Sequence, residues 1–144
     1  EQEEEIVMKT TSGPVEMPKP ALNREEFLEL RELVYMVPLP QNVARCAVAF
    51  CTASRSVSNG NDRFVDDYVA WGAGPRGSQN LVLASKARAL LFGRCAPTEE
   101  DIYSVATAIL RHRIIVNHRA VGDSIRPTDV IEHLLKKAGF QPAA

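Results

Sequence analysis

Residues 98–110 read TEEDIYSVATAIL, which is the clearest helix signal in the chain. Thr98 can cap the helix, and the three acidic residues after it place negative charge at the positive end of the helix dipole. We interpret those acidic residues as capping or solvated charges and not as a catalytic pair. The apolar residues repeat at the helical period, which predicts a buried face made of Ile102, Val105, Ala106, Ile109 and Leu110.

Two further helices are predicted upstream of this stretch. Asn23 and Glu26 have the spacing of a capping box, and Pro38 limits the helix that they open. Another helix is predicted over about residues 41–56. The buried faces are expected to contain Phe27, Leu30, Val34 and Val37 in the first helix, and Val43, Ala47 and Phe50, with Cys46 beside them, in the second.

Two more helices are predicted on either side of the opening stretch. One covers about residues 76–92 and is expected to end at Gly93 in the left-handed conformation. The last starts near Pro127 and ends at Gly139. Residues 64–71 are apolar but too few to assign to a strand or a helix. The predicted buried faces are Leu83, Ala87, Leu90 and Leu91, and then Val130, Leu134 and Ala138.

About five amphipathic helices without alternating strands predict an all-α fold, a small helical bundle. The chain has 144 residues, of which 45% are hydrophobic and 24% charged, so it suits one ordinary domain. Proline and glycine are concentrated in residues 10–20, which is the composition of a linker.

The composition argues against two common classes of partner. Seventeen basic and 18 acidic residues nearly cancel, which gives no electrostatic reason to expect nucleic acid or a membrane surface. No apolar run approaches the roughly 20 residues of a membrane-spanning helix. Cys46, Cys51 and Cys95 have no metal-type spacing, so we expect free thiols in a reducing cytoplasm. Because the chain opens on Glu1 within a helical pattern, we expect it to be part of a longer protein.

Residues 72–77, Gly-Ala-Gly-Pro-Arg-Gly, carry the strongest chemical signal. Glycines let the backbone approach a ligand, and Pro75 suits the first position of a helix, whose free amide groups attract anions. Arg76 adds a planar guanidinium group that matches phosphate oxygens. On these residues alone, a turn with a solvated arginine is the favoured interpretation.

The stretch from Tyr68 to Arg94 resembles the lid of AAA+ ATPases of the MoxR group. The pattern of that group runs Gly-Ala-Ser-Pro-Arg-Ala, then a helix containing Ala-Lys-Ala, then Gly-Arg. The start at Thr98, the Leu-Arg-His-Arg-Ile segment at 110–114 and the closing helix at 129–135 resemble the same group. Upstream, residues 3–7 resemble the last helix of its ATPase core. The resemblance thus covers nearly the whole chain.

Three positions depart from the pattern of the group. Gly74 replaces a serine, Gly77 replaces an alanine, and Arg126 replaces a capping serine. We expect the two glycines to loosen the 72–77 loop, because one removes a capping hydroxyl and the other weakens the first helical turn. Arg126 affects only a helix end.

The resemblance implies that Arg76 is the sensor 2 arginine, which reaches the γ-phosphate of ATP and assists catalysis. Gly74, Pro75 and Gly77 would lie beside it in the nucleotide-binding loop. ATP and Mg²⁺ would be bound mainly by a separate ATPase core, because this sequence has no Gly-x-x-x-x-Gly-Lys-Ser/Thr loop and no Walker B carboxylate. We therefore expect no ATPase activity from this chain alone.

The resemblance also implies a domain organisation and partners. Residues 1–9 would end the core helix, 10–22 would form a linker, and 23–144 would form the lid. The implied partners are the core of the same protein, neighbouring subunits in a ring that is usually a hexamer, and a protein with a von Willebrand factor A domain. The ring would couple ATP hydrolysis to chaperone-like remodelling or metalloenzyme maturation. Arg76 could serve its own subunit's ATP or a neighbour's, and both alternatives stay open.

Other residues receive structural interpretations. The Arg-His-Arg segment at 111–113 could bind phosphate or a neighbouring subunit, but basic residues at a helix end ordinarily complement the dipole, and we favour that interpretation. His118 and His133 lack ligand spacing, so no metal is expected. Lys86 and Arg88 are expected to face solvent, with contact to an adjacent core as the weaker alternative. The alternative function for the whole chain is a helical protein-interaction module with no nucleotide role.

Overall fold

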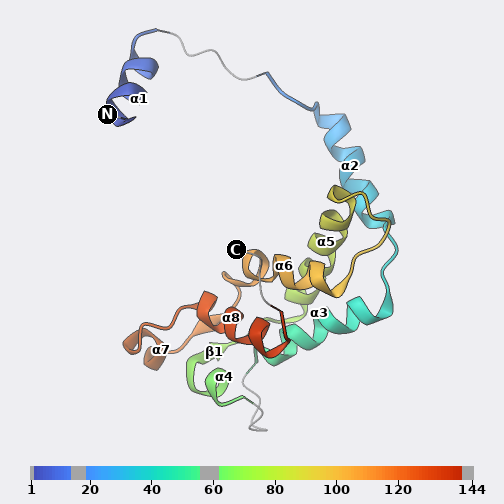
Figure 1. Ribbon diagram of the computed structural model, residues 1–144, viewed down its shortest axis with the longest axis vertical. Helices are drawn as coiled ribbons and strands as arrows, with labels where there is room; N and C mark the ends of the chain where they lie inside the picture. The colour runs from blue at the N-terminus through green and yellow to red at the C-terminus, as the bar shows by residue number, and fades with distance from the viewer. Residues whose placement is uncertain (1, 14–18, 56–61, 141–144) are drawn as a thin grey trace. The chain divides into compact units, whose positions relative to one another are not determined.

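The computed structural model describes residues 2–13, 19–55 and 62–140, which belong to two compact units, Glu1–Arg31 and Glu32–Ala144. The first unit holds helix α1 (Gln2–Thr11) and the start of helix α2 (Arg24–Met36), which ends in the second unit (Figure 1). The capping box is confirmed. Asn23 Oδ1 accepts a hydrogen bond from the Glu26 amide at 2.8 Å, and Glu26 Oε2 accepts one from the Asn23 amide at 2.8 Å. Residues 14–18 of the predicted linker lie outside the described residues.

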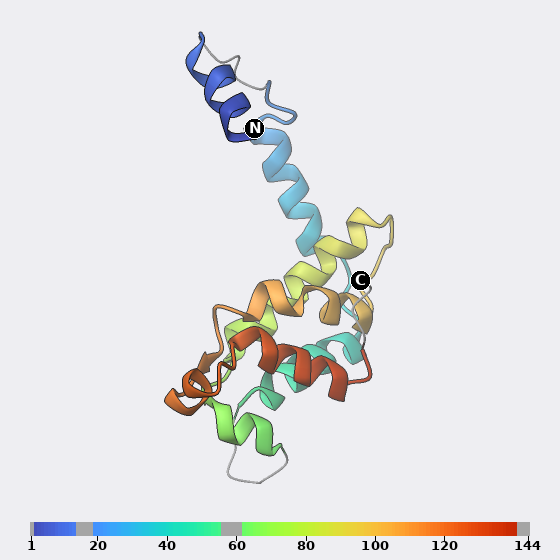
Figure 2. The same cartoon turned by 60° about the vertical axis from the view of Figure 1, so that its left-hand side comes forward.

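The second unit contains six further described helices and one small sheet. Helices α3, α5 and α6 pack on one another, α8 packs on α6, and α4 contacts α7 and α8 (Figures 1 and 2). The elements in chain order are α3 (Gln41–Ala53), α4 (Arg63–Tyr68), β1 (Val69–Trp71), α5 (Pro75–Leu91), α6 (Glu99–Leu110), β2 (Ile115–Val116), α7 (His118–Gly122) and α8 (Pro127–Lys137).

The predicted all-α fold is confirmed, and the five predicted helices correspond to α2, α3, α5, α6 and α8. The short helices α4 and α7 and the antiparallel pair β1–β2 were not predicted. Each depends on hydrogen bonds that the spacing of hydrophobic residues does not predict. The Asp62 carboxylate caps α4, whereas Asn117 caps α7 and donates from Nδ2 to the Asp67 carbonyl at 2.8 Å. In the sheet, Val69 pairs with Val116 and Trp71 with Ile115.

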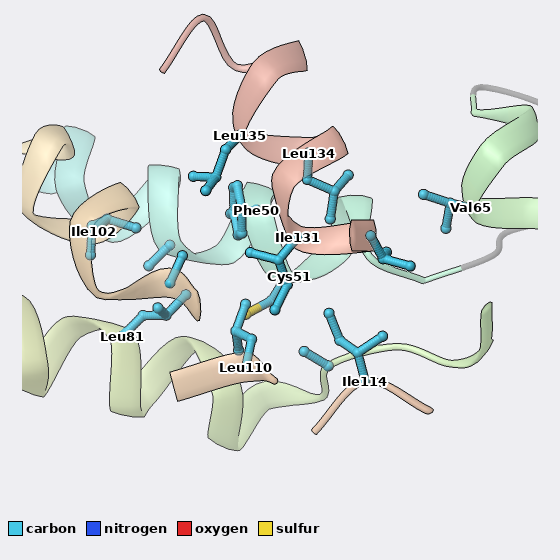
Figure 3. Close-up of a cluster of buried hydrophobic side chains, with 14 of the residues drawn as sticks. Phe50, Cys51, Val65, Leu81, Ile102, Leu110, Ile114, Ile131, Leu134 and Leu135 are labelled. Carbon is cyan, nitrogen blue, oxygen red and sulfur yellow. The ribbon is translucent and has the colours of Figure 1, made fainter. Parts of the chain in front are cut away.

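The hydrophobic core lies between α3, α5, α6 and α8 (Figure 3). The predicted inward residues of α3 are buried, and on α6 three of the five predicted residues are buried, with Val105 and Ile109 half-buried. All three cysteines are free, but only Cys51 is buried, whereas Cys46 is half-buried and Cys95 is exposed. The side chains labelled in Figure 3 are Phe50, Cys51, Val65, Leu81, Ile102, Leu110, Ile114, Ile131, Leu134 and Leu135.

The predicted buried face of α5 is wrong. Leu91 is 86% exposed and Leu90 is 38% exposed, and Leu83 and Ala87 are only half-buried. The buried residues recur at every fourth position instead: Gly77, Leu81, Ser85 and Ala89. Three of these four are small, which lets α5 approach α3 and α6 closely. The pattern of large apolar residues therefore indicated the wrong side of the helix.

Three other predicted inward residues are also exposed. Phe27 and Leu30 are 60% and 48% exposed, whereas Val37 of the same stretch is buried. Only the end of α2 belongs to the second unit, which contains the core. Ala138 is exposed because α8 ends at Lys137, and its buried face continues through Leu135.

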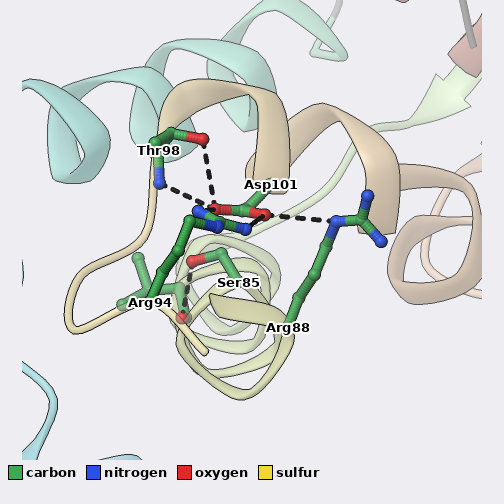
Figure 4. Close-up of polar contacts among 6 residues, drawn as sticks. Ser85, Arg88, Arg94, Thr98 and Asp101 are labelled. Carbon is green, nitrogen blue, oxygen red and sulfur yellow. Dashed lines mark hydrogen bonds and ion pairs between the residues drawn. The ribbon is translucent and has the colours of Figure 1, made fainter. Parts of the chain in front are cut away.

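Asp101 joins the end of α5 to the start of α6 (Figure 4). Gly93 closes α5 with a φ of +68°, as predicted, and the following Arg94 donates two hydrogen bonds of 2.6 and 2.7 Å to the Asp101 carboxylate. The same carboxylate accepts from the Thr98 amide at 2.8 Å, and Arg88 Nε lies 3.1 Å from it. Asp101 is only 1% exposed. The prediction that Arg88 faces solvent is therefore wrong, because its guanidinium pairs with a buried acid.

We expect the Asp101 cluster to make folding stability depend on acid pH. Burial acts to raise the pKa of Asp101, but hydrogen bonds from Arg94 and Thr98 together outweigh it and lower the pKa from 3.8 to about 2. A lowered pKa contributes stability above the unfolded value and loses it as pH falls towards 2. The loss should reach about 2 kcal/mol. Urea unfolding between pH 5 and 2 should show this loss in the wild type and a flatter curve in Asp101→Asn. Identical pH dependence in the two proteins would contradict the assignment.

Candidate functional site: the 72–77 loop and Arg76

Arg76 lies in the first turn of α5, where the sequence places it. Gly74 is the N-cap residue, Pro75 is the first helical residue, and Arg76 follows. The Arg76 side chain is exposed, and within the described part of the chain no hydrogen bond or ion pair engages its guanidinium group. The first turn of a helix presents free amide groups and the positive dipole end, so this end of α5 favours an anion.

Ser54, at the end of α3, holds the 72–77 loop in place. Its hydroxyl donates to the Cys51 carbonyl at 2.7 Å and accepts from the Ala73 amide at 2.9 Å. Ser54, Gly72 and Ala73 are all buried. A Cβ atom on Gly72 would lie 2.3 Å from the Ser54 carbonyl oxygen, so only glycine fits there. The sequence prediction missed Ser54, because nothing in the local pattern links it to a loop 18 residues later.

Gly77 has a packing role that the sequence did not indicate. It is buried, and a Cβ there would lie 3.2 Å from Cys51 Sγ and 3.3 Å from Leu110 Cδ2. Its missing side chain thus lets α5 begin against α3 and α6. Burial raises the pKa of the Cys51 thiol, opposed by a hydrogen bond with Ser78 and by the charges of Arg55 and Arg113. Arg55 also comes close to the loop, since its Cγ atom would lie 2.7 Å from a Cβ on Gly72.

The first strand places an apolar surface just before the loop. Trp71 is 74% exposed and its pairing partner Ile115 is 60% exposed. A separate groove of about 800 Å³ runs along the outer face of α3. None of residues 72–77 lines that groove, although Arg55 does. Within the described residues, the 72–77 loop thus lies apart from that groove and carries the exposed guanidinium group of Arg76.

His133 makes a structural contact that the sequence prediction missed. Its Nε2 atom lies 2.9 Å from the Asp62 carboxylate, and Lys137 Nζ lies 3.0 Å from the same group. Burial acts to raise the pKa of Asp62, but hydrogen bonds from Lys137 and His133 lower it overall. The pair ties α4 to α8 across 71 residues of sequence. Within the described ranges, no cluster of three or more His, Cys, Asp or Glu side chains is arranged to hold a metal ion.

Residues 62–134 match the family described as the AAA lid domain, and this match covers just over half of the chain. The chain belongs to the AAA lid domain family. This lid domain is 29% identical over 136 residues to Chaperone MoxR1 of Mycobacterium tuberculosis, covering 94% of the chain and 36% of that protein. It is 25% identical over 130 residues to the uncharacterised protein YeaC of Bacillus subtilis, covering 90% of the chain and 38% of that protein.

A solved structure supports the same placement. The lid domain superposes with a TM-score of 0.81 and 26% identity on a Cytophaga hutchinsonii protein provisionally described as an ATPase. The match covers 94% of the lid domain and 41% of that protein. The chain therefore spans between a third and a half of the length of these relatives, and the resemblance to the lid of MoxR-type AAA+ ATPases is confirmed. None of the described helices is long and apolar enough to cross a membrane.

We expect Gly72→Ala to destabilise this lid domain by about 2 kcal/mol or more, because the new methyl group would overlap the Ser54 carbonyl and force the backbone to shift. Gly74→Ser is the matched control in the same loop. Gly74 has a φ of −85°, which suits serine, and no atom lies within 4 Å of a Cβ there. The new hydroxyl can cap α5, so stability should rise by about 0.3 kcal/mol. Urea unfolding of both variants measures the difference, and equal stabilities would contradict the role of Gly72.

Proposed function

We propose that this domain is the nucleotide-sensing lid of a MoxR-type AAA+ ATPase and that Arg76 is its sensor 2 arginine. The observation that carries the proposal is the exposed, unengaged guanidinium of Arg76 at the start of α5, in a domain of the AAA lid family. Lid residues 23–144 would follow a linker at 10–22 and the end of a core helix at 1–9. The core would hold most of the ATP and Mg²⁺. Arg76 would act on this ATP, with Gly74, Pro75 and Gly77 beside it in the loop.

Charge and rigidity support this role. ATP would supply a γ-phosphate whose oxygens carry negative charge during transfer, and a guanidinium group binds two such oxygens at once. Arg76 has no carboxylate partner to give up in the described chain, so it can bind an anion without breaking an ion pair. The buried contact between Ser54 and Ala73 holds the loop that carries it. A donor that is already in position lowers the cost of binding the transition state.

The wider biological role is the one that the resemblance to MoxR-type ATPases implies, and it belongs to the proposal. We propose that the full-length protein works as a ring, usually a hexamer, in the cytoplasm, where its free thiols stay reduced. The ring would couple ATP hydrolysis to chaperone-like remodelling or metalloenzyme maturation, with a von Willebrand factor A domain protein as partner. The name of the mycobacterial relative, a chaperone, supports the remodelling role.

Replacing Arg76 with alanine in the full-length protein should lower ATP turnover at saturating ATP by about 100-fold. The loss is expected because the variant removes charge stabilisation of the transferred phosphoryl group, while the exposed position leaves folding unaffected. Arg45→Ala is the matched control, since Arg45 is an exposed arginine of α3 outside the loop. Unchanged ATP turnover in Arg76→Ala would contradict the sensor role. A helical protein-interaction module with no nucleotide role would then be the better explanation.

Mixed rings separate the two ways in which Arg76 could act. Arg76→Ala subunits would be combined with subunits whose own ATP site is inactivated. If Arg76 serves the ATP of a neighbour, a mixed ring can place the intact ATP site of an Arg76→Ala subunit next to the intact Arg76 of the other subunit type. ATP turnover then recovers. If it serves the ATP of its own subunit, mixing restores nothing.

A further inference from the structure

The groove on the outer face of α3 has the composition of a docking site for a helix. It has a volume of about 800 Å³ and is lined by residues from α3, from the start of α4 and from the end of α8. Most of the side chains that α3 contributes are small, among them Ala44, Ala49, Thr52 and Ala53. Small side chains let a second helix backbone come close, as Gly77, Ser85 and Ala89 of α5 do within the core.

Val48 is an exposed apolar side chain in the middle of this face. It is 54% exposed, whereas the residues on the opposite side of α3, such as Val43 and Phe50, are buried in the core. Helix α3 thus has apolar residues on two sides, and the described chain covers only one of them. The α3 side of the groove runs from Gln41 to Arg55, which is about 20 Å at the rise of a helix. That length fits about four turns of a partner helix lying along α3.

The exposed charges along the groove are basic. Arg45, Arg55 and Lys137 are the exposed charged residues of its described lining, and α3 itself contains no Asp or Glu. The acidic lining residues, Asp62 and Asp66, are both half-buried. Asp62 already pairs with Lys137 at 3.0 Å, so Lys137 is compensated. Arg45 and Arg55 differ from other exposed arginines of the domain because they line one apolar groove, before and after its small residues.

We propose that the α3 groove binds an acidic amphipathic helix of a partner protein. The apolar side of that helix covers Val48 and lies close to α3 over Ala49 and Ala53. Its Asp or Glu side chains reach Arg45 and Arg55, which are separated by about three helical turns of sequence. This proposal goes beyond the sensor function and does not depend on it, because none of residues 72–77 lines the groove.

The test measures the binding of two labelled synthetic peptides to the full-length protein by fluorescence anisotropy. Both peptides form amphipathic helices with leucine on one side, and the other side carries glutamate in the first peptide and lysine in the second. The glutamate peptide should bind with a Kd of about 10–100 µM, and the lysine peptide at least about tenfold more weakly, because like charges repel. No saturable binding of the glutamate peptide, or equal binding of both peptides, would overturn the proposal.

Two variants locate the site within the domain. Val48→Glu and Arg45→Glu should each weaken binding of the glutamate peptide about tenfold, because each adds negative charge where that peptide would lie. Val121→Glu and Arg111→Glu are the matched controls, since they change an exposed valine and an exposed arginine outside the groove. All four variants should melt as the wild type does, because the replaced side chains are exposed. Equal weakening in variants and controls would mean general attraction by charge and would overturn the proposal.

Two other occupants of the groove would give different results. If a second copy of the chain fills it, Val48→Glu should lower the molecular mass that sedimentation measures without peptide. If nucleic acid fills it, a single-stranded oligonucleotide should displace the glutamate peptide. Either result would overturn the proposal, whereas an unchanged mass and an undisplaced peptide would support it.

Discussion

The close approach of α5 to α3 and α6 is the constraint on which the rest of the domain depends. It is made possible by small buried residues, Gly77, Ser85 and Ala89, spaced so that one side of α5 has little volume. Dense packing along that side fixes the direction of the helix, because a side chain added there would have no space. Both ends of α5 are then held by polar contacts. The exposed Arg76 therefore projects from a helix whose backbone is held rigidly in place.

The arginines at the two ends of α5 differ in whether they have an acidic partner. At its C-terminal end, Arg88 and Arg94 neutralise the buried Asp101, and this cluster joins α5 to α6. At its N-terminal end, Arg76 has no acidic partner within the described chain. Paired charges in a dry environment hold structure, whereas unpaired cations beside a positive helix dipole invite an anion. This contrast distinguishes a structural corner from an exposed cation, in keeping with the sensor role that we propose for Arg76.

Local patterns predicted the helices well but not the surfaces through which they pack. The caps at Asn23, Gly93 and Gly139 were predictable because each depends on residues within one turn of the helix end. The buried face of α5 was not, because hydrophobic periodicity follows large apolar residues and this helix packs through small ones. Helices α4 and α7 also escaped prediction, since five or six residues give too little periodicity to detect.

The sequence by itself determined that this is an all-α lid domain, where its main helices lie, and that Arg76 follows a proline at a helix start. Those features depend on neighbouring residues, so they can be read along the chain. Only the tertiary structure decided that Ser54 holds the loop, that Arg88 pairs with a buried acid, and that Gly77 lets α5 begin against α3 and α6. Each of these contacts joins residues from different elements. Their energies depend on burial and distance, which local sequence does not contain.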